Sequence, residues 1–161
     1  MTDIALNHWL TEFRRELHRF PELSNEEFET TRRLREALEA KQIRILDLPL
    51  RTGLVVEVGG QRPGPLVILR ADIDALPIEE VSGVPWPSEN PGVMHACGHD
   101  FHSAAALGAA ILLRAKEESL AGTVRIIFQP AEETGHGAPA VLATGALDGA
   151  KAIFGIHNDP A

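Results

Sequence analysis

The amino-acid sequence predicts an α/β domain of three layers, in which a mixed β-sheet is flanked by helices. Strand-like and helix-like segments alternate through the second half of the 161-residue chain. This alternation is typical of layered α/β domains. Two candidate strands, residues 66–71 and 123–129, are also largely apolar, as expected of strands inside such a sheet.

The first forty residues predict two helices. Between residues 6 and 17, large apolar side chains recur at spacings of four, three and four, which predicts a helix over residues 4–20. Pro21 ends it, because proline disfavours helical dihedral angles in the residue before it. Ser24 followed by Glu27 has the spacing of a capping box, which predicts that a second helix begins here.

The remaining elements follow from apolar runs and turn residues. Strands are expected at residues 43–48, 54–58, 66–71, 123–129 and 152–156, and helices at 101–118 and 138–143. Two glycines and a Pro-Gly-Pro sequence separate the second strand from the third, so these two are expected to form a hairpin. The proline-rich segment 76–93 is expected to be a fixed loop at a functional site.

Charge and cysteine content exclude several classes of protein. The net charge of −8 and the pI near 5.3 argue against nucleic acid or an anionic membrane as partner. A single cysteine excludes an internal disulfide and fits a reducing compartment. The longest apolar run, residues 104–113, is too short to span a bilayer, and no signal-type stretch begins the chain. A cytoplasmic location is therefore expected.

Reactive side chains are densest at residues 94–102, Met-His-Ala-Cys-Gly-His-Asp-Phe-His. Gly98 lets the backbone bend until Cys97 and His99 reach one ion. A thiolate with an imidazole suits zinc and other borderline divalent metals. One alternative is a buried cysteine beside helix-capping histidines. Another makes Cys97 a nucleophile with His99 or His102 as its base.

Further donors follow the expected strands. They are Asp72 and Asp74, Glu132 and Glu133, and His157, Asn158 and Asp159. Ligands gather at the carboxyl ends of strands in α/β sheets, so these residues are expected to meet Cys97, His99 and Asp100 at one edge. A glutamate pair is more often solvated surface, and a lone histidine is more often a core polar group. Four segments that deliver donors to one edge nevertheless favour a site.

The adjacent glutamates indicate hydrolytic chemistry. Neighbouring residues of an extended chain point to different sides, so one glutamate is expected to bind metal while the other faces the reacting centre. A carboxylate beside a metal can take a proton from attacking water and pass it to a leaving amine.

Five motifs occur in order along the chain. They are Arg-Arg-Glu-Leu-His at 14–18 with Pro-Glu-Leu-Ser at 21–24, Arg-Ala-Asp-Ile-Asp-Ala-Leu-Pro at 70–77, Pro-Gly-Val-Met-His-Ala-Cys-Gly-His-Asp at 91–100, Gln-Pro-Ala-Glu-Glu at 129–133, and Gly-Ile-His at 155–157. Together they resemble the amidohydrolase branch of the aminoacylase/carboxypeptidase metallopeptidase family, which includes hippurate hydrolases, indoleacetyl-amino-acid hydrolases and N-acetyldiaminopimelate deacetylases.

The resemblance implies a role for each matched residue. The metal ligands would be Cys97, His99, Glu133 and His157. Glu132 would be the general base, and Asp74 would orient a ligand. The cofactor would be two divalent ions, zinc or manganese, and the substrate a small N-acyl amino acid whose amide bond is hydrolysed. Full-length relatives are expected to be homo-oligomers.

Members of that family are more than twice this long, and after the strand that precedes His157 they insert a lid domain and then complete the sheet. The resemblance therefore implies that residues 1–161 are the N-terminal part of a metallo-amidohydrolase catalytic domain, incomplete relative to the family. Weak or absent turnover by this chain and an exposed apolar sheet edge are expected. The alternative is a metal-binding fragment without turnover that needs a complementing chain.

Overall fold

A five-stranded mixed sheet forms the centre of the protein, whose computed structural model describes residues 2–158. The strands are β1 (Arg44–Ile45), β2 (Leu54–Gly59), β3 (Leu66–Asp72), β4 (Thr123–Gln129) and β5 (Ala150–Gly155). They lie in the order β1-β2-β4-β3-β5. β2 runs antiparallel to β1 and β4, whereas β3 is parallel to both β4 and β5. The first predicted strand is thus much shorter than residues 43–48.

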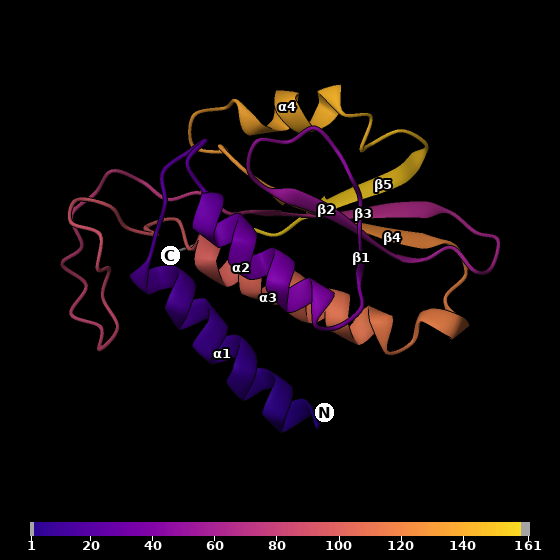
Figure 1. Ribbon diagram of the computed structural model, residues 1–161, viewed down its shortest axis with the longest axis horizontal. Helices are drawn as coiled ribbons and strands as arrows, with labels where there is room; N and C mark the ends of the chain where they lie inside the picture. The colour runs from indigo at the N-terminus through magenta and orange to yellow at the C-terminus, as the bar shows by residue number, and fades with distance from the viewer. Residues whose placement is uncertain (1, 159–161) are drawn as a thin grey trace.

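Helices cover both faces of this sheet (Figure 1). They are α1 (Asp3–Arg19), α2 (Phe28–Glu39), α3 (His99–Arg114) and α4 (Gly137–Ala143), with a short 3₁₀ turn, η1 (Glu117–Ser119). The main core joins α2 and α3 to the sheet through residues such as Leu38, Leu107 and Phe128. A smaller core under α4 contains Ile68 and Val141. The predicted three-layer α/β class is therefore confirmed.

The predicted hairpin between β2 and β3 is wrong, because β4 lies between these strands. The loop after β2 bonds to the segment that enters β4: Gly60 N–H donates to the Gly122 carbonyl at 2.8 Å, and Thr123 N–H donates to the Pro65 carbonyl at 2.9 Å. The turn residues do reverse the chain. They do not make the two flanking strands neighbours, since α3 carries the chain back to insert β4 parallel to β3.

The predicted capping box is also wrong. The Glu22 carboxylate caps the second helix, accepting bonds from the Glu29 and Thr30 N–H groups at 3.1 and 2.7 Å. Ser24 instead donates its hydroxyl to Asp74 Oδ2 at 2.6 Å. Glu27 is fully buried. Both residues are therefore used for contacts that are distant in sequence.

The Glu27 carboxylate connects α2 to two loops. It accepts a bond from the Thr52 hydroxyl and another from Ala131 N–H, each at 2.7 Å. Ala131 follows Pro130 and has a positive φ of 49°, a conformation that costs energy for a residue with a side chain. The bond from Ala131 N–H holds this turn in place just ahead of Glu132.

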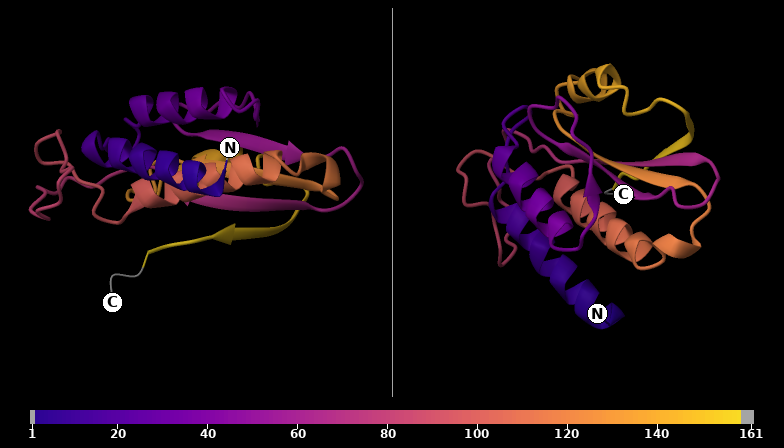
Figure 2. Two further views of the ribbon diagram at one scale, coloured as in Figure 1. Left: turned by 90° about the horizontal axis from the view of Figure 1, so that it is seen from below. Right: turned by 45° about the vertical axis from the view of Figure 1, so that its right-hand side comes forward.

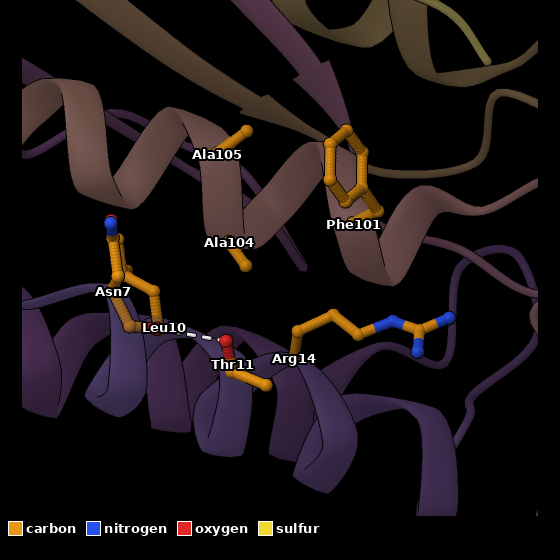
Figure 3. Close-up of a pocket in the computed structure, with 7 residues that line it drawn as sticks. All are labelled: Asn7, Leu10, Thr11, Arg14, Phe101, Ala104 and Ala105. Carbon is orange, nitrogen blue, oxygen red and sulfur yellow. Dashed lines mark hydrogen bonds between the residues drawn. The ribbon is translucent and has the colours of Figure 1, made fainter. Parts of the chain in front are cut away.

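α1 packs along α3 and extends as far as the first turn of α3. A Cβ atom at Gly108 of α3 would lie 2.7 Å from Leu10 Cδ1, so glycine permits the close approach. Beyond this contact the two helices leave a groove lined by Leu10, Phe101 and Ala104 (Figure 3). Arg14 extends from α1 toward the first turn of α3, where its Nε lies 2.7 Å from Asp100 Oδ2.

β5 forms one edge of the sheet (Figure 2). Its residues Ile153 and Phe154 are 52% and 59% exposed, and Ile156 just after it is 65% exposed. This is the exposed apolar edge that the sequence predicts. None of the described helices is long and apolar enough to cross a membrane.

Replacement of Glu27 by alanine is expected to destabilise the protein. The buried Ala131 N–H and Thr52 hydroxyl would lose their acceptor, and each unpaired buried donor costs about 1–3 kcal/mol. We expect the free energy of unfolding, measured by urea titration, to fall by at least that amount. Glu26→Ala is the matched control, because Glu26 is exposed. Equal stability of the two variants would contradict the role given to Glu27.

Candidate metal centre

The carboxyl ends of the three parallel strands meet the start of α3 at one edge of the sheet. Three sets of potential ligand atoms lie within 4.8 Å of one another there. The sets are Cys97, His99 and His157; His99, Glu132 and Glu133; and Asp72, His99 and His102. His99 belongs to all three. The predicted convergence of β3, β4, β5 and the loop before α3 on one edge is therefore observed.

His99 presents one free ring nitrogen to this cluster. Its Nδ1 donates to the Asp74 carbonyl at 2.9 Å and lies 3.2 Å from Asp74 Oδ1. That bond requires the proton on Nδ1, so the neutral ring has its lone pair on Nε2. Nε2 is buried without a hydrogen-bond partner among the described residues. A histidine whose second nitrogen is held by a carboxylate or carbonyl is the usual form of a metal ligand.

Asp74 is the hub of the polar contacts. Besides His99, its Oδ2 accepts bonds from the Ser24 hydroxyl at 2.6 Å and from Glu133 N–H at 3.0 Å. Burial acts to raise the pKa of Asp74, but these hydrogen bonds outweigh it and the pKa lies below the usual value. Asp74 is therefore ionised, and it orients both His99 and the backbone of Glu133.

Gly98 shapes the turn between Cys97 and His99. Its φ of 77° lies in the left-handed region, and a Cβ atom would fall 2.0 Å from Asn158 Nδ2. A side chain at this position would thus clash as well as strain the backbone. α3 begins at His99, two residues earlier than predicted, so His99 is its first helical residue.

The acidic surroundings of Cys97 disfavour a free thiolate. Hydrogen bonding to Glu133 and burial raise the pKa of the Cys97 thiol to about 11. A cysteine nucleophile needs the opposite shift. The raised pKa argues against the alternative in which Cys97 attacks the substrate with His99 or His102 as base. A cation at the site would counteract the rise in pKa.

Glu132 and Glu133 lie in a turn after β4 and not in an extended strand. Both carboxylates therefore face the same histidine, with Glu132 Oε2 at 4.0 Å and Glu133 Oε1 at 3.9 Å from His99 Nε2. The expectation that they point to different sides is wrong. They differ in exposure, since the Glu132 side chain is 37% exposed and the Glu133 side chain 17%.

His157 completes one side of the cluster. Its Nδ1 donates to the Asn158 carbonyl at 2.7 Å, which leaves the Nε2 lone pair free. Asp159, also expected here, lies outside the described residues. His102 is buried and packs against both His99 and His157, with ring centres 5.3 and 4.9 Å away. Its Nε2 accepts the Asn158 N–H at 3.1 Å, so it holds the segment that carries His157.

Asp72 adds a further buried carboxylate. Arg70 forms an ion pair with it, and Oδ2 lies 4.0 Å from His99 Nε2. Burial raises the pKa of Asp72 to about 6 despite the attraction of Arg70. Asp72, the last residue of β3, thus adds another carboxylate beside the same histidine.

Asp100 does not join the cluster, contrary to expectation. As the second residue of α3 it points toward α1, where Oδ2 lies 2.8 Å from His18 Nδ1 and 2.7 Å from Arg14 Nε. His18 Nε2 lies 3.0 Å from Glu80 Oε1. This buried network was not predicted from the sequence, because its members lie 62 and 82 residues apart. Its two members on α1, Arg14 and His18, both belong to the Arg-Arg-Glu-Leu-His motif, which is the sequence signal for this network.

The donor set fits a divalent cation. His99 Nε2 and Glu133 Oε1 are both buried and lack hydrogen-bond partners among the described residues, which is costly unless something else binds them. Of the four carboxylates of the cluster, Asp72 alone has an ion pair with an arginine or lysine among the described residues, namely Arg70. Sulfur, nitrogen and oxygen donors together suit zinc and similar metals.

The fold and these residues define the class: an α/β domain with a candidate metal centre at the carboxyl ends of its parallel strands. The family model described as peptidase family M20/M25/M40 matches residues 68–161. The chain belongs to this family.

Individual relatives agree with this assignment. The chain is 53% identical over 156 residues to the N-acetyl-L-cysteine deacetylase of Bacillus subtilis strain 168, which covers 97% of the chain and 38% of that relative. It is 47% identical over 151 residues to IAA-amino acid hydrolase ILR1-like 6 of Arabidopsis thaliana, covering 92% of the chain and 32% of the relative. The crystal structure of the Bacillus subtilis YXEP protein, described as a dinuclear metal binding peptidase from the M20 family, superposes with a TM-score of 0.96 and 52% identity, over 99% of this chain and 45% of that one. The chain thus spans less than half the length of these relatives.

Stability is expected to depend on pH through His18. The hydrogen bond with Asp100 raises the pKa of this buried histidine above its usual 6.5, although burial opposes the shift. The resulting stabilisation is fully present below pH 6.5 and is lost as pH rises through the folded-state pKa. Urea midpoints should therefore fall as pH rises above 6.5, and His18→Gln should flatten the decline. His8→Gln, at an exposed position, is the control. If the urea midpoint of His18→Gln falls with pH as steeply as that of the parent, His18 is not the cause of the pH dependence.

Proposed function

We propose that this chain is the N-terminal part of the catalytic domain of a metal-dependent amidohydrolase, and that the complete protein hydrolyses the amide bond of N-acyl amino acids. The metal would be zinc or manganese, with two ions in a complete site. One observation carries the proposal: two groups of converging donor atoms, Cys97 with His99 and His157 and His99 with Glu132 and Glu133, come from three separate segments and share His99.

Relatives support the reaction type. The names of two similar proteins specify deacetylation of N-acetylcysteine and hydrolysis of an amino-acid conjugate, and the YXEP protein is described as dinuclear. All three descriptions fit an enzyme that cleaves an amide with metal assistance. The single cysteine and acidic charge further support a cytoplasmic location, and homo-oligomers of the longer protein stay a prediction.

The proposed mechanism divides the work among residues of this chain. Cys97, His99, Glu133 and His157 would hold the ions, and Asp74 would fix the ring of His99. When bound, a divalent cation supplies Lewis acidity to the amide carbonyl and to the attacking water. Glu132, the more exposed glutamate, would accept a proton from that water as its oxygen bonds to the carbonyl carbon.

The same carboxyl group would then return the proton to the amide nitrogen. The C–N bond breaks, the acyl group leaves as a carboxylic acid, and the amino acid leaves with the transferred proton on its nitrogen. No oxidant or second substrate besides water is needed. The reaction therefore balances with one proton-transfer residue.

The two glutamates are expected to give different defects in a protein completed by the C-terminal segment. Glu132→Gln should retain metal and lose turnover by about 10² to 10⁴, because an amide cannot accept the proton. Glu133→Gln should lose metal. Metal content and kcat, measured on the same samples, separate the two roles, with exposed Glu118→Gln as control. A reversed pattern would exchange the assignments, and full activity of both variants would refute the mechanism.

The isolated chain is expected to hydrolyse N-acetyl and N-benzoyl amino acids poorly when loaded with zinc or manganese. If an oxyanion-stabilising donor comes from the C-terminal segment, its loss alone costs about 10² to 10³ in rate. Adding that segment as a second chain should restore turnover. Restored turnover distinguishes an enzyme part from a fragment that only binds metal. Rapid turnover by a stable monomer of the isolated chain would show that no further segment is needed.

A further inference from the structure

A cavity of about 470 Å³ lies directly beside the candidate metal centre. Cys97, Gly98 and His157 line one side of it. The end of α1 and residues 80–96 of the loop between β3 and α3 supply most of the remaining lining, which we call the far wall. Small-molecule sites in proteins commonly have volumes of about 300–1,000 Å³. The cavity therefore has the size and the position to hold the part of a substrate next to the bond that is cleaved.

The charged side chains on the far wall of this cavity are paired with one another. His18 lies 3.0 Å from Glu80 and 2.8 Å from Asp100, which also pairs with Arg14. Glu80 accepts a further bond from Ser88 N–H at 2.5 Å. Two basic groups thus face two carboxylates, and the far wall has no surplus charge to bind a charged substituent.

The rest of the far wall is apolar or uncharged. Val84 and Met94 are half-buried side chains that face the cavity together with Ala96. His95 also lines it, is 4% exposed, and has no hydrogen-bond partner for either ring nitrogen among the described residues. This wall therefore offers apolar contact and a hydrogen-bonding edge, which suits an uncharged group of a substrate.

We propose that this cavity binds the acyl group of the substrate, and that Val84 limits the size of the acyl group that fits. The inference rests on the proposed function, because it assumes an N-acyl amino acid at the centre. Such a substrate has two parts. The amino-acid part carries a carboxylate, which the charge-balanced wall cannot pair, whereas an alkyl or aryl acyl group is uncharged and matches Val84 and Met94.

The test compares acyl groups in the full-length protein that contains this chain. Val84→Trp narrows the cavity, so the ratio of kcat/KM for N-benzoyl to N-acetyl substrates with the same amino acid should fall at least tenfold, a change typical of altered apolar pocket contacts. Val84→Ala should shift the ratio in the opposite direction. The matched control is Val81→Trp, because Val81 is on the same loop, is 91% exposed and does not line the cavity; it should leave the ratio at the parental value.

The outcomes distinguish a failure of the acyl-group assignment from a failure of the proposed function. If the parent hydrolyses N-acyl amino acids but neither Val84 variant changes the acyl ratio, the cavity assignment is overturned while the proposed function stands. The same conclusion follows if these variants alter selectivity for the amino-acid part instead. An N-succinyl substrate that is cleaved as well as its uncharged N-butanoyl counterpart would also overturn it. A parent that cleaves none of these amides overturns the proposed function itself.

Discussion

The candidate centre depends on the buried carboxylate of Asp74. This group holds His99 through Nδ1, the Glu133 backbone through N–H, and the segment before α2 through Ser24. The turn after β4, the first residue of α3 and the segment before α2 are thereby fixed to the end of β3. Because the carboxylate accepts all three bonds in its ionised form, one proton on it would weaken the whole arrangement. The orientation of His99 Nε2 follows from this residue, since Nδ1 contacts both its carbonyl and its carboxylate.

Two backbone positions add to this constraint. Gly98 adopts a left-handed conformation beside Asn158, and Ala131 adopts one just ahead of the two glutamates. The glycine accepts this conformation at little cost, whereas Ala131 needs the bond from its N–H to Glu27. Glu27, the residue just before α2, thus helps to direct Glu132 and Glu133 toward His99. Strained turns at a site persist when surrounding contacts over-determine them.

The sequence predicts the elements and the members of the cluster well, because apolar periodicity and strand ends are local signals. It predicts their pairing poorly. The turn after β2 is a strong hairpin signal, yet β4 from some sixty residues later occupies the neighbouring position. Ser24 and Glu27 have capping-box spacing, but each bonds a partner outside its helix. Asp100 adjoins His99 in sequence and points the other way, because consecutive residues of a helix diverge by about 100°.

That divergence separates two electrostatic environments at the start of α3. On the Asp100 side, Arg14 and His18 balance Asp100 and Glu80, and burial is tolerable because every charge has a partner. On the His99 side, Asp72, Asp74, Glu132 and Glu133 surround one histidine, and among the described residues Arg70 alone pairs with any of them as a permanent cation. Such an excess of buried negative charge is unfavourable unless a positive charge enters. One turn of helix therefore places a site suited to a cation next to a wall suited to an uncharged group.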